Sequence, residues 1–459
     1  MQKLAILLAL LSATAISRSD ATATATAAAA VRMQLTHTDA GRGLSRRELL
    51  QRMAQRSKAR AARLLPRIAS GSVTPGQLAD GVIPDTEYLA HFAIGTPPQA
   101  VQLDLDTGSD LTWTQCLPCV SCFDQALPYF NMSLSSTLSV LPCASPKCQA
   151  LPLSSCGKQK GWGHDACVYA YAYGDKSVTT GLLNSDTFRF TGAAECMEAP
   201  GMAFGCGVFN NGVFYSNETG VAGFGRGPLS LPSQLKVDNF SYCLTAITES
   251  TPSYFLLGLP ANLHSNAHGA VQTTPLIQNP KGPTFYHLSL KGITVGSTRL
   301  PIPESTFRLT TKGKGGTIID SGTGMTVLPM EVYKLVHDAF VAQVKFPARD
   351  FLFETNPVQD LTDAKVPVSQ LCFSVPPGAK PAVPKLVFHF EGATLDLPRE
   401  NYMFEIEEAG RNFTCLALNA GGAGSNLTII GNYQQQNMHV LYDLAKNKLS
   451  FVRAHCDKV

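Results

Sequence analysis

The chain has 459 residues, of which 15% are charged and 44% are hydrophobic. This length predicts two or three folded units, each with a substantial core. The low charge, together with 38 Gly, 29 Pro and 23 Phe, excludes a coiled coil and global disorder. The formal net charge is +3 and there are 13 Cys, two numbers that need the chain to be divided before they can be interpreted.

Residues 1–20 have the pattern of a secretory signal peptide. Lys3 is followed by an apolar run at 4–11 and then by small residues as far as Ala15. The apolar run is too short to span a membrane, and an uncleaved anchor is the alternative interpretation. We expect a secreted (apoplastic) product without a membrane anchor, and the vacuole is the alternative destination.

Residues 21–80 are predicted to be a basic segment that is later removed. An Ala/Thr run is followed by ten Lys or Arg between positions 32 and 67, against only Asp39 and Glu48. Leu and Met residues spaced among them indicate an amphipathic helix. Residues 1–80 carry a formal charge of +8, so the remaining 379 residues carry −5. The segment is therefore either a processed linker or an inhibitory prosegment held by charge, and no nucleic-acid partner is expected for a secreted chain.

From about residue 83 the sequence becomes typical of a β-rich body. Short alternating apolar runs are separated by Gly, Pro, Asn and Asp, as in residues 88–94, 101–105, 285–290 and 385–390. The clearest helix is at 330–344, because Pro329 precedes an apolar face with helical spacing. We expect an all-β fold with short helices.

The body contains an internal duplication. One apolar strand ends in Asp106-Thr-Gly-Ser109 and another in Asp320-Ser-Gly-Thr323. An apolar-apolar-Gly triplet follows each of them at similar spacing, at 221–223 and at 429–431. A single Asp-Thr-Gly match is a weak signal, because Asp and Gly are common in turns. Two matches in the same strand context, each with the same kind of partner, are a strong signal.

This arrangement resembles the pepsin (A1) family of aspartic proteases, and in particular the plant nepenthesin-like type. The resemblance implies a bilobal fold in which two β-barrel-like lobes flank a substrate cleft, with one catalytic Asp in each lobe. The implied boundaries are 84–265 for the N-terminal lobe, about 114–170 for a Cys-rich insert within it, 266–459 for the C-terminal lobe and about 88–454 for the peptidase domain.

The chemistry of such a pair follows from its electrostatics. Two carboxylates held about 3 Å apart cannot both ionise at low cost, so they share one proton. The ionised member takes a proton from water and the protonated member donates to the substrate carbonyl. By resemblance, Asp106 and Asp320 form this pair in an aspartic endopeptidase (EC 3.4.23 class) that is most active at acid pH, and no metal or organic cofactor is expected. The implied supporting residues are Thr107, Gly108, Ser109, Ser321, Gly322 and Thr323.

Residues 169–181 indicate a β-hairpin with a Gly/Asp turn. Its counterpart in the family is a mobile flap over the cleft. The resemblance implies that four residues belong to the flap or contact the substrate, namely Tyr173, Gly174, Asp175 and Trp113. The indole N–H of Trp113 would donate a hydrogen bond to the Tyr173 hydroxyl. Many relatives have Gly where this chain has Lys176. That cation either favours acidic substrate side chains or is a solvated turn residue.

The cysteines indicate disulfides rather than a zinc cluster, because a secreted chain is oxidised. Spacing alone gives no connectivity. The family framework implies the pairs Cys116–Cys119, Cys122–Cys206, Cys143–Cys167, Cys148–Cys156, Cys243–Cys456 and Cys372–Cys415. It leaves Cys196 as a free thiol, either buried or exposed and redox-sensitive.

The expected partners are protein or peptide substrates and the basic segment itself, acting as an intramolecular inhibitor of a monomeric enzyme. An Arg or Lys would lie between the two ionised Asp side chains, and acid would loosen this contact and allow self-cleavage at about 70–85. The rival hypothesis is a catalytically silent secreted binding protein of the same fold, such as a glycosidase inhibitor. Five Asn-x-Ser/Thr sequons are candidate glycosylation sites, namely Asn131, Asn217, Asn239, Asn412 and Asn426.

Overall fold

The computed structural model describes most of the chain after residue 30. The described ranges are 31–70, 87–158, 165–173, 177–191, 196–212, 217–249, 251–258, 267–353, 368–422 and 424–458. The predicted signal peptide, the flap tip with Gly174, Asp175 and Lys176, and the expected cleavage region after residue 70 lie outside these ranges.

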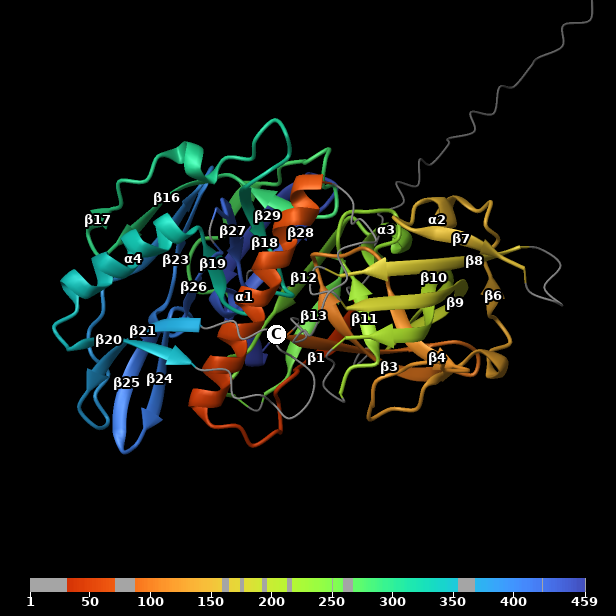
Figure 1. Cartoon of the computed structure of the whole chain (residues 1–459), viewed down its shortest axis with the longest axis horizontal. Helices are drawn as coiled ribbons and strands as arrows, with labels where there is room; N and C mark the ends of the chain where they lie inside the picture. Colours follow the sequence, from red (N-terminus) through yellow and green to blue (C-terminus); the bar gives the residue numbers. More distant parts are fainter. Residues whose placement is uncertain are drawn as a thin grey trace, which may run out of the picture.

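The largest sheet of the described residues has sixteen strands and joins the two halves of the body (Figure 1). Its order is β14-β29-β28-β12-β13-β1-β2-β3-β11-β4-β10-β9-β8-β7, with β5 beside β4 and β6 beside β9. The strands are β1 (Val31–His37), β2 (Tyr88–Ile94), β3 (Gln99–Asp106), β4 (Trp113–Leu117), β5 (Phe130–Asn131), β6 (Ser139–Val140), β7 (Ser154–Gly157), β8 (Ala166–Ala172), β9 (Val178–Thr191), β10 (Cys196–Asn211), β11 (Gly220–Gly223), β12 (Asn239–Cys243), β13 (Ser253–Leu257), β14 (Gln272–Pro275), β28 (Met438–Asp443) and β29 (Lys448–Arg453).

In the described part of the C-terminal half there are three smaller sheets. Their orders are β15-β18-β27-β19-β26, β17-β16-β22-β23 and β20-β21-β25-β24. The strands are β15 (Tyr286–Leu288), β16 (Leu290–Val295), β17 (Thr298–Arg299), β18 (Gly316–Ile319), β19 (Thr326–Leu328), β20 (Ala348–Phe353), β21 (Val368–Val375), β22 (Leu386–Phe390), β23 (Ala393–Asp396), β24 (Met403–Glu408), β25 (Arg411–Leu416), β26 (Leu418–Ala420) and β27 (Leu427–Ile430). The mainly β architecture confirms the predicted fold class.

Two α-helices of the described residues are longer than two turns. These are α1 (Arg46–Ser70) and α4 (Met330–Gln343), beside the short α2 (Pro146–Gln149) and α3 (Leu231–Leu235). The predicted helix after Pro329 is α4, and its buried face comprises Val332, Val336 and Phe340. None of the helices in the described ranges is long and apolar enough to cross a membrane.

Helix α1 crosses the middle of the molecule and packs on the C-terminal half, against β19, β21, β24, β26 and β27 (Figure 1). It begins with a capping box, because Ser45 Oγ accepts from Glu48 N at 3.2 Å and Glu48 Oε2 accepts from Ser45 N at 2.8 Å. Among the side chains of α1 that the structure describes, the buried apolar ones are Leu50, Met53, Ala54, Ala59, Ala61 and Leu64. The basic stretch is therefore an amphipathic helix, and its apolar face is covered by the body.

Strand β1 lies within the same amino-terminal segment and was not predicted from the sequence. Val31, Met33 and Leu35 alternate along it and are buried. The strand pairs antiparallel with β13 on one side and with β2 on the other. Residues 31–70, called the amino-terminal segment below, thus contribute one central strand and one covering helix to the body.

Four of the six implied disulfides are wrong. The structure pairs Cys116 with Cys206, Cys119 with Cys122, Cys143 with Cys156 and Cys148 with Cys167. It also has Cys243–Cys456 and Cys372–Cys415, the two pairs on which it agrees with the family framework. Cys196 has no disulfide partner and is exposed.

Burial explains the difference within the Cys-rich insert. Cys116 on β4 is buried and faces β10, which runs parallel to it and carries Cys206. Cys148 on α2 and Cys167 on β8 are likewise both buried. The four partly or fully exposed cysteines are left to pair with one another, namely Cys119, Cys122, Cys143 and Cys156. Within the insert, burial therefore indicates the pairing better than spacing in the sequence does, although Cys119 and Cys122 are only three residues apart.

Candidate active site

The two Asp-containing loops follow equivalent strands. Strand β3 ends at Asp106 and runs parallel to β11, with Asp106 opposite Gly223. Strand β18 ends one residue before Asp320 and runs parallel to β27, with Ile319 opposite Ile430. Each apolar-apolar-Gly triplet therefore lies directly beside its Asp loop, and the duplication in sequence is a duplication in space.

The two carboxylates have matching hydrogen-bond partners. Each accepts from the backbone N–H two residues later and from the hydroxyl three residues later. The distances are 2.8 Å from Gly108 N and 2.5 Å from Ser109 Oγ to Asp106, and 3.2 Å from Gly322 N and 2.7 Å from Thr323 Oγ1 to Asp320. Both Asp residues are only 1% exposed, so these bonds replace those that water would otherwise make to the carboxylates.

The loops are also bonded to each other. Ser321 N donates to Thr107 Oγ1 at 2.9 Å, and Thr107 N donates to Ser321 Oγ at 3.1 Å. Thr107 Oγ1 lies 3.3 Å from Asp320 Oδ1 and donates to it. This reciprocal pair holds the two Asp loops in one rigid unit, which no analysis of either loop alone could establish.

Arg60 of helix α1 occupies the space between the two carboxylates. Its Nη2 lies 2.5 Å from Asp106 Oδ1 and 3.1 Å from Asp320 Oδ1, and its Nε lies 2.6 Å from Asp320 Oδ2. Both Asp side chains therefore meet at a single nitrogen atom. Burial alone would raise the pKa of Asp106, but the charge of Arg60 and the bonds from Ser109 and Gly108 outweigh burial and lower it.

The described part of the predicted flap hairpin lies near the first Asp loop, since Asp106 acts electrostatically on Tyr173. Strand β8 pairs with β9, and Tyr173 N donates to Ser177 O at 2.8 Å, which closes the hairpin on both sides of the undescribed tip. The indole Nε1–H of Trp113 donates to Tyr173 Oη at 2.6 Å. Burial, with the nearby Tyr171 and Asp106, raises the pKa of the Tyr173 hydroxyl well above its ordinary value, so this hydroxyl stays protonated.

A cavity of about 110 Å³ adjoins the flap. Its lining combines the Cys-rich insert, strand β8 and the start of the C-terminal half, through residues such as Leu153, Tyr171, Leu229 and Phe285. Asp110 also lines it and is held in place, accepting from Gly227 N at 2.8 Å and from Thr284 Oγ1 at 2.7 Å. The sequence analysis did not identify these residues, because no motif marks them.

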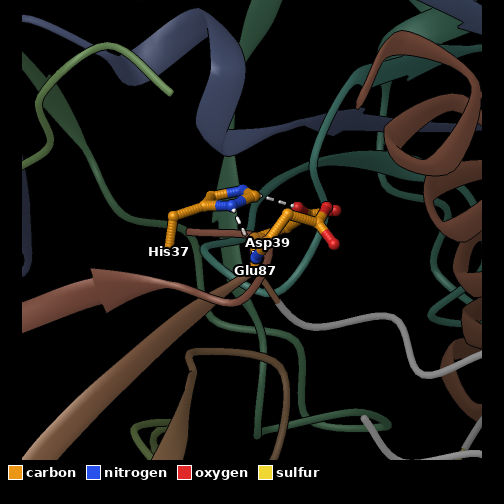
Figure 2. A group of neighbouring side chains, drawn as sticks. All are labelled: His37, Asp39 and Glu87. Atoms are coloured by element: carbon orange, nitrogen blue, oxygen red, sulfur yellow. Dashed lines mark hydrogen bonds and ion pairs between the residues drawn. The ribbon is translucent and has the colours of Figure 1, made fainter. Parts of the chain in front are cut away.

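A second buried cluster, not predicted from the sequence, is formed by His37, Asp39 and Glu87, which converge in Figure 2. His37 Nε2 lies 3.0 Å from Glu87 Oε2. Arg56 Nη2 lies 2.8 Å from Asp39 Oδ2 and 2.6 Å from Glu87 Oε2. Such a donor set can hold a metal ion, but here the guanidinium of Arg56 already occupies the point where the carboxylates meet. The cluster is therefore an ion-pair network.

The sequons differ in exposure. Asn426 is exposed, whereas Asn131, Asn217, Asn239 and Asn412 are partly buried. Asn131 already bonds Ser133 through its side-chain oxygen, at 3.0 Å to the backbone nitrogen. Glycan addition thus remains a prediction, with Asn426 as the most accessible site.

Comparison with known proteins identifies the family. Residues 88–259 match the model of the family described as "Xylanase inhibitor N-terminal", and residues 285–453 match "Xylanase inhibitor C-terminal". Among solved structures, "Crystal structure of edgp" is similar with a TM-score of 0.61 and 20% identity, covering 83% of this chain and 95% of that one. "Crystal structure of Basic 7S globulin from soybean" has a TM-score of 0.60, 20% identity and coverage of 81% and 95%. At this identity the structures establish the shared fold only.

Several proteins share a higher sequence identity with this chain than these solved structures do. "Aspartic proteinase nepenthesin-1" of Nepenthes gracilis is 41% identical, over 92% of this chain and 90% of the relative. "Aspartic proteinase nepenthesin-2" of the same plant is 40% identical over the same shares. "Aspartyl protease family protein 2" of Arabidopsis thaliana is 36% identical over 89% of this chain and 80% of the relative. The chain therefore belongs to the nepenthesin-like plant aspartic proteases of the pepsin family.

Proposed function

We propose that residues 84–459 form an aspartic endopeptidase in which Asp106 and Asp320 activate a water molecule. The observation that carries this proposal is the meeting of both carboxylates at Arg60 Nη2, at 2.5 and 3.1 Å. Once that guanidinium leaves, the two carboxylates face each other and share one proton. The pair as a whole titrates, so acid and base are not assigned to individual residues.

The surrounding groups support the same chemistry. Bonds from Ser109 and Thr323 orient the outer carboxylate oxygens, at 2.5 and 2.7 Å, so that the inner oxygens can hold water. A closing flap with Tyr173 would exclude bulk water and order the substrate. Water attack then yields a tetrahedral intermediate, and a proton from the pair passes to the leaving amine.

The amino-terminal segment is proposed to be an autoinhibitory prosegment. Arg60 forms ion pairs with both carboxylates of the proposed catalytic pair, and α1 covers the surface of the C-terminal half beside it. Six disulfides support secretion, since they persist in oxidising compartments, with the vacuole as the alternative destination. The lobes proposed at 84–265 and 266–459 meet along the sixteen-stranded sheet.

A silent binding protein is the second candidate, favoured by the inhibitor description of the family models. The test is cleavage of a denatured protein at acid pH by the processed chain, comparing the unmodified protein with Asp320→Asn. We expect cleavage that the substitution lowers by at least about a hundredfold, since general acid–base catalysis alone contributes roughly 10²–10⁴-fold. Equal cleavage by the variant would contradict the assignment of the pair, and no cleavage by the processed unmodified chain would favour the binding protein.

A further inference from the structure

Glu87 lines the surface that α1 covers, beside the second Asp loop. A side-chain carbon at Gly324 would lie 2.6 Å from Glu87 Oε1 and 3.1 Å from Ser57 Oγ. A side-chain carbon at Gly322, two residues earlier, would lie 2.6 Å from the guanidinium of Arg60. Successive glycines of one loop thus face Arg60 and then Glu87, which places Glu87 along the same covered surface as the catalytic pair.

The backbone of this loop is in direct contact with α1 at the same place. Met325 N donates to Ser57 Oγ at 2.7 Å, and Ser57 Oγ in turn donates to Met53 O at 2.6 Å. A loop N–H that α1 satisfies here is available to another chain once α1 has left. The surface next to Glu87 therefore offers a backbone donor as well as a carboxylate.

A cationic side chain fills the space in front of Glu87. Arg56 Nε lies 2.8 Å from Glu87 Oε1 and Arg56 Nη2 lies 2.6 Å from Oε2, and both side chains are 0% exposed. This two-bond arrangement is the geometry by which carboxylates recognise guanidinium groups. The structure thus contains a built site for a basic side chain, one helical turn from the catalytic pair, because Arg56 and Arg60 are four residues apart.

The cations around Glu87 come from the amino-terminal segment, whereas Glu87 itself belongs to the body. It immediately precedes β2, which pairs with β3 from Leu89 opposite Asp104 onward. The neighbouring Tyr88 is buried, and its hydroxyl accepts from Gln436 Nε2 at 3.3 Å. Loss of the segment removes both Arg56 and His37 and leaves the carboxylate anchored at the edge of the cleft.

We propose that Glu87 is a specificity-determining residue of the processed enzyme, which binds a Lys or Arg side chain of the substrate in the place that Arg56 fills here. This inference rests on the proposed function. Four residues of helix span about 6 Å, and two residues of extended peptide span about 6.6 Å. The basic residue is therefore expected two or three positions from the scissile bond.

The experiment uses acid-processed protein and a set of fluorogenic peptides that share one cleavage site. A single Lys is placed in turn at the three positions on each side of the bond, and each peptide is paired with one that carries norleucine there. We expect one position at which kcat/KM for Lys exceeds that for norleucine by about tenfold, as for a hydrogen bond to a charged group. Glu87→Gln is expected to lower this ratio to about 1.

A matched control is Glu331→Gln, an exposed residue of α4, which is expected to keep the ratio. If Glu87→Gln does not accumulate because Arg56 loses its two bonds to the Glu87 carboxylate, the double variant Arg56→Met/Glu87→Gln serves in its place. A ratio that stays high without Glu87, or that never rises above 1 at any position, overturns the inference while leaving the protease assignment intact. If neither peptide of any pair is cleaved, both the proposed function and this inference are contradicted.

Discussion

The guanidinium of Arg60 lies 2.5 Å from the Oδ1 atom of Asp106, although 46 residues separate the two in sequence. Both side chains are almost completely buried, at 5% and 1% exposure. A buried ion pair holds its two side chains together mainly because separating them would leave an uncompensated charge in the interior, which costs free energy. The same contact that blocks the proposed catalytic pair thus also helps to hold α1 on the body.

Substitution Arg60→Met is expected to weaken this attachment. Removing one partner of a buried pair costs about 3–5 kcal/mol, and here two carboxylates lose their shared cation. We expect the purified full-length chain to shorten at a higher pH than the unmodified chain, as seen by gel electrophoresis after incubation across acid to neutral pH.

The control is Arg46→Met on the same helix. Arg46 is half exposed and its Nη2 lies 3.7 Å from Glu405 Oε2, a pair worth less than about 1 kcal/mol. The substitution Arg46→Met is therefore expected to change the pH at which the chain shortens only slightly. An equal effect of both substitutions would mean that general loss of helix charge, rather than the contact with the Asp pair, controls release.

The Asp39–Arg56–Glu87 network predicts a second source of acid sensitivity. Burial would raise the pKa of both carboxyls, but the charge of Arg56 outweighs it, aided for Asp39 by His37 and Arg52 and for Glu87 by bonds from His37 and Arg56. Since both pKa values are lowered in the folded state, the stabilisation is complete above the ordinary values of about 4 and is lost as pH falls through the lowered ones.

Hydrogen exchange of β1 and α1, corrected for the intrinsic rate, measures this effect. Protection in the unmodified chain is expected to fall as pH drops below about 4. Asp39→Asn is expected to show weaker protection already at neutral pH and a smaller further loss in acid. Asp338→Asn, exposed on α4, is the control. Retention of the full acid transition in Asp39→Asn would show that Asp39 does not contribute to it.

The bond between Trp113 and Tyr173 gives a prediction about the flap. Tyr173→Phe removes the hydroxyl that accepts from the indole at 2.6 Å but keeps the ring. A hydrogen bond contributes about 0.5–1.5 kcal/mol, so kcat/KM for a peptide is expected to fall by about threefold to tenfold. Tyr173→Ala is expected to lower kcat/KM further, because it also removes the ring that packs on Trp113. Equal activity of the Phe variant and the unmodified enzyme would exclude a role for the bond in positioning the flap.

Local patterns explain what could be predicted from the sequence. The apolar runs at 88–94 and 385–390 correspond to β2 (Tyr88–Ile94) and β22 (Leu386–Phe390), because alternating burial on a sheet has a period of two residues that is visible in the sequence. The Asp loops were recognisable because each repeats a strand, a turn and hydroxyl side chains. Their reciprocal bond through Thr107 and Ser321 supports this match of pattern and geometry.

Contacts between distant segments account for what was missed. Val31, Met33 and Leu35 alternate as in any strand, but they lie beside a low-complexity run, and only pairing with β2 and β13 shows their place in the sheet. Glu87 and Arg56 are single charged residues with no motif. Their pairing depends on how α1 docks, which is a property of the folded chain and not of either sequence segment.

The disulfide pairing of the Cys-rich insert can be tested by graded reduction. Attack by a thiolate requires access to a sulfur atom, so the more exposed bonds are expected to open first under mild reductant, namely Cys119–Cys122 and Cys143–Cys156. The buried bonds Cys116–Cys206 and Cys148–Cys167 are expected to resist until the chain unfolds. Alkylation followed by mass spectrometry reports the order, and Cys196, exposed and free, should label before any reductant is added. Early labelling of Cys116 together with Cys119 would contradict this pairing and restore the one implied by the family framework.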